Sequence, residues 1–159
     1  MAASWAAGML VELTISVDGS GVGCMHRDTK ASFILAQGYY VPAAVFMWVM
    51  IRRYGLDLRR AFFCAGAMAW WEALTMGAVA LLSPMFVFAP LLAAYYVTTY
   101  SLCAMAGLLV VDNRTLHAAA PRQISIRRLV AYGAVGGAAC WAVFVAWAAL
   151  AARLFGLDL

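Results

Sequence analysis

The feature that most constrains this chain is a series of four long apolar runs, at residues 31–51, 61–82, 86–111 and 129–152. About 20 helical residues cross a hydrocarbon core about 30 Å thick, because each residue advances an α-helix by about 1.5 Å. Lipid offers no hydrogen-bond partners to the backbone, so spans of this length must be helical. The sequence therefore predicts an all-α integral membrane protein, a four-transmembrane-helix bundle.

The composition agrees with that class and excludes others. Of the 159 residues, 67% are hydrophobic and only 11% are charged, whereas soluble domains average roughly 45–50% and 25%. A soluble domain of this size buries only about two-thirds of its chain surface and would leave much apolar surface in water. A soluble enzyme domain, a disordered chain and a nucleic-acid-binding module are therefore excluded as first interpretations, and we expect no nucleic-acid partner.

The chain divides into an N-terminal segment, residues 1–30, a transmembrane domain, residues 31–152, and a short tail, residues 153–159. Within the first, residues 4–17 are apolar except for Glu12 and a few hydroxyl groups. This stretch is too short to span a bilayer. We expect it to form an interfacial helix or to pack on a partner.

Arginines mark the orientation that the spans would take. The loop at residues 52–60 carries four arginines and one acid, and the loop at residues 112–128 carries four more arginines. By the positive-inside rule, both loops face the cytoplasm, or the matrix of a mitochondrion. Both termini then lie on the opposite side. The expected location is a bacterial inner (plasma) membrane or a mitochondrial inner membrane.

Glu72 stands near the middle of the second run, where an acid costs about 2.5–3.5 kcal/mol on insertion scales. None of the four runs contains Lys, Arg or His. We therefore expect the carboxyl group to be neutral, hydrogen-bonded, or both. Two interpretations stay open. Glu72 is a proton or cation relay or a ligand anchor, or it forms a structural hydrogen bond to another helix or a neighbouring subunit.

Other polar and aromatic side chains in the runs complete a candidate site for ligand or proton binding. They are Gln37, Tyr40, Trp71, Tyr96, Thr99 and Tyr100. If they converge near the membrane midplane, they form a mostly apolar pocket that suits a small amphiphilic ligand. The alternatives are that the hydroxyl groups bond to their own helix backbone and that Trp71 packs in the core.

Two sets of small residues predict close helix packing. Ala65, Ala69, Ala73 and Gly77 recur every four residues in the second run, and Gly133 and Gly137 do so in the fourth. Such patterns let helix backbones approach closely, either within one chain or between chains. Three of the four cysteines lie inside the runs and are expected to be small buried hydrophobes.

The sequence predicts no catalytic residue and no metal ligand set, and it identifies no cofactor. P-loop, GxSxG, HExxH and GxGxxG patterns are absent. The favoured hypothesis is a non-catalytic membrane subunit or scaffold of a larger complex, whose partners are the bilayer and other membrane subunits or further copies. One alternative is a small oligomeric transporter or channel that uses Glu72. A second is a membrane enzyme or binder of a lipid, quinone or pigment.

Overall fold

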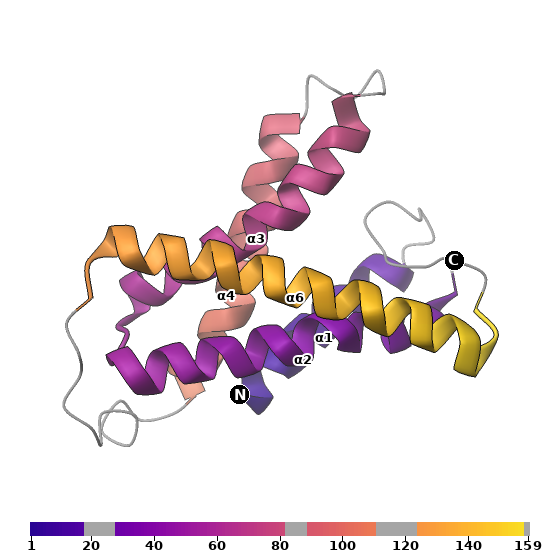
Figure 1. Cartoon of the computed structure of the whole chain (residues 1–159), viewed down its shortest axis with the longest axis horizontal. Coiled ribbons are helices and arrows are strands. Elements are labelled where there is room, and N and C mark those ends of the chain that lie inside the picture. Colours follow the sequence, from indigo (N-terminus) through magenta and orange to yellow (C-terminus); the bar gives the residue numbers. More distant parts are fainter. Residues whose placement is uncertain (18–27, 82–88, 111–123, 158–159) are drawn as a thin grey trace.

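The computed structural model describes residues 1–17, 28–81, 89–110 and 124–157, and every regular element in these ranges is an α-helix (Figure 1). The helices are α1 (Ala2–Val17), α2 (Thr29–Tyr54), α3 (Leu58–Leu81), α4 (Ala89–Val110) and α6 (Ile126–Phe155). The predicted all-α class is confirmed. Each of the four apolar runs forms one helix over its described part.

The helix ends lie in polar sequence just outside the apolar runs. At the start of α2 the Asp28 side chain accepts a hydrogen bond from the Ala31 N–H at 2.9 Å, and the Ser125 hydroxyl accepts one from the Arg128 N–H at 3.4 Å at the start of α6. Helix α2 ends at Gly55, whose φ of 56° is left-handed. Glycine adopts this conformation at no steric cost. Caps in the loops therefore lengthen α2 and α6 beyond their apolar runs.

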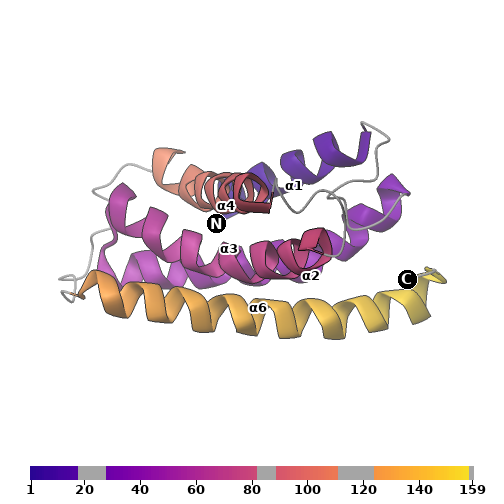
Figure 2. The same cartoon turned by 90° about the horizontal axis from the view of Figure 1, so that it is seen from above.

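The helices form three layers when the molecule is viewed from above (Figure 2). Helix α6 lies along one side, α2 and α3 lie in the middle, and α1 and α4 lie on the other side. Helices α2 and α6 run antiparallel, whereas α3 and α4 form a hairpin that crosses this pair at an angle (Figure 1). The C-terminal end of α3 and the N-terminal end of α4 project away from α2 and α6.

Among the residues whose side chains the structure describes, two helices, α2 and α6, are long and apolar enough by length and composition to cross a membrane. These two helices coincide with the predicted first and fourth spans, and the predicted four-span bundle is not confirmed. In α3 and α4 the stretches whose side chains the structure describes are interrupted, at Glu72 and Tyr96 among other positions, and are shorter than a membrane span.

Helices α3 and α6 approach each other closely because α6 presents glycines to α3. A Cβ atom at Gly133 would collide with the Cys64 carbonyl oxygen. A Cβ atom at Gly137 would lie 2.7 Å from the Met68 carbonyl oxygen. On α3, Ala65 is also buried. These small residues thus serve contacts within the chain, as small-residue patterns do in membrane helices.

Ala69 is fully buried as well. The other two residues of the pattern, Ala73 and Gly77, lie outside the set whose side chains the structure describes.

Candidate functional site

Gln37 is held by helix α1. Its Oε1 accepts a hydrogen bond from the Trp5 indole at 2.9 Å. Its Nε2 donates to the Phe33 carbonyl oxygen at 3.1 Å and lies 2.8 Å from the Met9 sulfur. Both ends of the amide are therefore engaged, and two of the partners belong to α1. Residues 1–17 lie outside the four long apolar runs, so sequence depth alone did not indicate α1 as the partner of Gln37.

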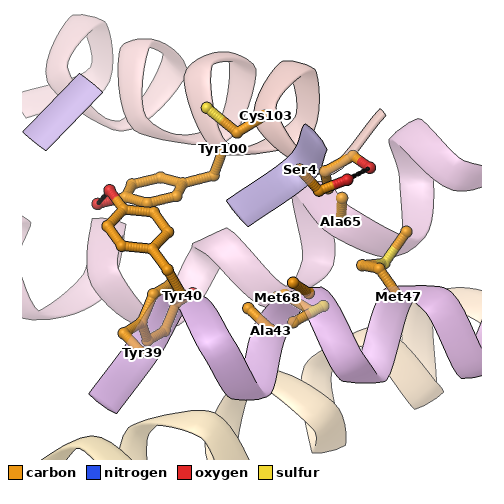
Figure 3. Close-up of a pocket in the computed structure, with 11 residues that line it drawn as sticks. Ser4, Tyr39, Tyr40, Ala43, Met47, Ala65, Met68, Tyr100 and Cys103 are labelled. Carbon is orange, nitrogen blue, oxygen red and sulfur yellow. Dashed lines mark hydrogen bonds between the residues drawn. The ribbon is translucent and has the colours of Figure 1, made fainter. Parts of the chain in front are cut away.

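Tyr40 of α2 and Tyr100 of α4, both candidate residues, are brought together (Figure 3). Their rings stack with centroids 5.8 Å apart, and the Tyr40 hydroxyl donates to the Tyr100 hydroxyl at 3.3 Å. Tyr39 packs edge-on against both rings and also meets Trp141 of α6 at 6.2 Å. Aromatic pairs of this kind contribute about 0.5–1.5 kcal/mol beyond their burial, so this cluster ties three helices together.

A small cavity of about 30 Å³ lies beside the tyrosine cluster (Figure 3). Residues from α1 to α4 line it, namely Ser4, Tyr39, Tyr40, Ala43, Ala44, Met47, Ala65, Met68, Tyr100, Cys103 and Ala104. A water molecule needs about 10–15 Å³ measured in this way, whereas sites for drug-sized ligands occupy about 300–1,000 Å³. The cavity therefore has room for one or two waters and is too small for an amphiphilic ligand.

A larger and more open groove of about 340 Å³ lies between α1 and α2. Its lining residues are Met1, Ala2, Trp5, Gln37, Val41, Ala44 and Val45. The polar groups among these side chains, those of Trp5 and Gln37, are hydrogen-bonded to each other. The groove therefore presents an apolar wall, and its volume falls in the range of small-molecule sites.

Of the remaining candidate residues that the structure describes, Trp71 and Thr99 line neither the cavity nor the groove. Trp71 is 39% exposed, and its indole donates to the Ala134 carbonyl oxygen of α6 at 2.6 Å. Thr99 is half-buried on α4. The side chains of Glu72 and Tyr96 lie outside those that the structure describes, so their convergence with Gln37 stays a prediction.

Sequence reasoning missed a buried polar pair on the seam between α1 and α2. Glu12 is 1% exposed and Ser32 is fully buried, and the Ser32 hydroxyl donates to Glu12 Oε1. The signal was present in the sequence. Ser4, Gly8 and Glu12 recur every four residues and so share one helix face, and all three are buried. This face is the one that α1 packs against its own chain.

Other polar side chains bond to helix backbones. The Ser4 hydroxyl donates to the Ala104 carbonyl oxygen at 3.0 Å and accepts from the Gly107 N–H at 3.2 Å, which joins α1 to α4. Ser101 donates to the Val97 carbonyl oxygen of its own helix at 2.6 Å, as hydroxyl groups in membrane helices commonly do. Polar groups in α1 and α4 therefore connect helices or satisfy backbone oxygens.

The described residues contain no group of three or more His, Cys, Asp or Glu side chains that could hold a metal ion. Cys64, Cys103 and Cys140 are buried free thiols, as expected for small hydrophobes. The chain matches no protein-family model, no curated protein and no solved structure.

Proposed function

We propose that this chain is a non-catalytic integral membrane subunit that places α2, α3, α4 and α6 in the bilayer and assembles with other membrane proteins. The observation that carries the proposal is how its polar side chains are used. Gln37, Ser4 and Trp71 each bond to another helix of the same chain. In the described part of the molecule they do not converge on one cavity of substrate size, which favours a structural role.

The outer surface of α6 supports assembly in a membrane. Residues 129–152 carry no charge. Only 22% of the most apolar stretch of 18 residues in α6 is buried within the molecule. Val135 and Val145 are 70% and 60% exposed. Contiguous exposed apolar surface of this kind marks a membrane or protein contact.

The orientation proposed for the chain follows from its arginines. The C-terminal end of α2 and the N-terminal ends of α3 and α6 lie at one end of the molecule (Figure 1), and these ends carry most of the arginines. This end faces the cytoplasm or the mitochondrial matrix. The C-terminal end of α6 then faces the other side of a bacterial or mitochondrial inner membrane, whereas Met1 lies beside Val41 and Val45, midway along α2.

Extraction in a mild detergent tests the proposal. The chain is expected to leave the membrane in an assembly larger than one copy, and a stable lone monomer would contradict this. Ala142→Phe, on the exposed face of α6, is expected to weaken the assembly. Ala94→Phe, on the exposed face of α4, is the matched control and should leave it intact.

A second candidate function, binding of a lipid, quinone or pigment, is favoured by the groove of about 340 Å³ between α1 and α2. Val41→Trp would fill this groove, whereas Val49→Trp changes an equally exposed valine of the same helix that does not line it. Mass spectrometry should find a lipophilic molecule with the wild type and Val49→Trp but not with Val41→Trp. Purification free of such a molecule from all three would count against this function.

A further inference from the structure

Six arginines gather where three helix ends meet. They are Arg52, Arg53, Arg59, Arg60, Arg127 and Arg128. Leu56, between α2 and α3, and Leu129 of α6 are fully buried in the same hydrophobic cluster. The rings of Tyr54 and Tyr132 lie 6.0 Å apart and join α2 to α6. The segments that carry the arginines are therefore packed together, and we call this region the arginine end.

The arginine end is strongly positive and open. Five of its six arginines are exposed and Arg60 is half-buried. Asp57 is the one acidic residue in the sequence of residues 52–60 and 124–128, and its carboxylate accepts a hydrogen bond from the Arg60 N–H at 2.7 Å. The N-terminal ends of α3 and α6 add two positive dipole poles, and the C-terminal end of α2 adds one negative pole. The local charge therefore favours an anion.

Aromatic side chains border the arginines on the side of the apolar helices. The guanidinium carbon of Arg52 lies 5.8 Å from the ring centroid of Trp48, and that of Arg53 lies 5.8 Å from that of Tyr54. Trp48 and Tyr132 are 44% and 43% exposed. Tryptophan and tyrosine gather at the level of lipid headgroups. Arginines directly beyond such rings lie at the depth of the phosphate groups.

We propose that the arginine end binds the headgroup of an anionic phospholipid. Guanidinium groups bind phosphate oxygens in bidentate fashion, and basic pockets between membrane helices on this side of a bilayer bind anionic headgroups. A zwitterionic lipid carries a cation that the arginines repel. The inference rests on the proposed placement of the chain in a membrane. An acidic protein is the less suitable occupant, because the aromatic border places the arginines at headgroup depth.

Native mass spectrometry of the full chain in mild detergent, titrated with phosphatidylglycerol or phosphatidylcholine, tests this site. The wild type is expected to bind phosphatidylglycerol more tightly. Each arginine replaced, as in Arg53→Gln and Arg128→Gln, should weaken that binding about fivefold, which corresponds to about 1 kcal/mol per basic residue. Arg128→Lys keeps the charge but loses the bidentate contact, and its affinity should lie between those of the wild type and Arg128→Gln.

Arg153→Gln is the matched control, since Arg153 is exposed at the opposite end of α6. Equal binding of the two lipids, or an equal loss in Arg153→Gln, would overturn the lipid site while leaving the membrane placement intact. The lipid site would also be overturned if the chain bound an acidic protein in a salt-sensitive way and showed no preference between the two lipids. A purified chain that stays monodisperse without any amphiphile would instead overturn the proposed function.

Discussion

At the scale of single residues, hydrogen bonds between buried side chains select how α1 docks. Glu12 and Ser32 are both buried at the seam of α1 and α2 and are joined by a hydrogen bond. In an apolar environment each such bond contributes about 0.6–2 kcal/mol. We expect Ser32→Ala to lower the free energy of unfolding in detergent by about 1 kcal/mol and to speed hydrogen exchange in α1. Thr98→Val, an exposed hydroxyl on α4, is the control, and an equal effect there would argue against the docking role.

Glu72 offers a second test at this scale, argued from its sequence environment. If the carboxyl group is neutral and makes a structural hydrogen bond, Glu72→Gln keeps a donor and an acceptor. We then expect little change in thermal stability or assembly for Glu72→Gln and a loss of about 1 kcal/mol for Glu72→Leu. Thermal unfolding in detergent measures both. Loss of proton-coupled flux in liposomes with Glu72→Gln would support the transport alternative instead.

At the scale of helices, glycines decide which pairs touch. Gly133 and Gly137 bring the α6 backbone against that of α3. Overpacking such a contact costs about 1–3 kcal/mol. Gly133→Val should therefore destabilise the fold by about that amount, as measured by thermal unfolding in detergent. Ala139→Val, on the exposed face of α6, should change stability little, and similar losses in both variants would contradict this packing.

At the scale of the whole molecule, the arginine end defines the expected topology. Asp57 lies at that end and Arg153 lies at the opposite end of α6. Cys64, Cys103 and Cys140 are buried. A chain in which serine replaces Cys24 should therefore react little with thiol reagents before a new cysteine is introduced. An impermeant reagent added outside whole cells should label Arg153→Cys and not Asp57→Cys. Labelling with the opposite preference would reverse the proposed orientation.

The sequence by itself determined the helical class and the apolar runs, because helix length and hydropathy depend on residues close together in the chain. It also determined which helices carry a face of small residues that allows close packing, since four-residue spacing is a local property. The same kind of local pattern, Ser4, Gly8 and Glu12, marks the buried face of α1.

Only the tertiary structure decided the partners of those faces. It paired Gln37 with Trp5 rather than with another long run, stacked Tyr40 on Tyr100, and set the α3–α4 hairpin across α2 and α6 (Figure 1). Such choices depend on contacts between residues far apart in sequence, which local spacing does not contain. The native pairing of helices is the one that brings backbones and aromatic rings into close contact while leaving few buried polar groups without a hydrogen-bond partner.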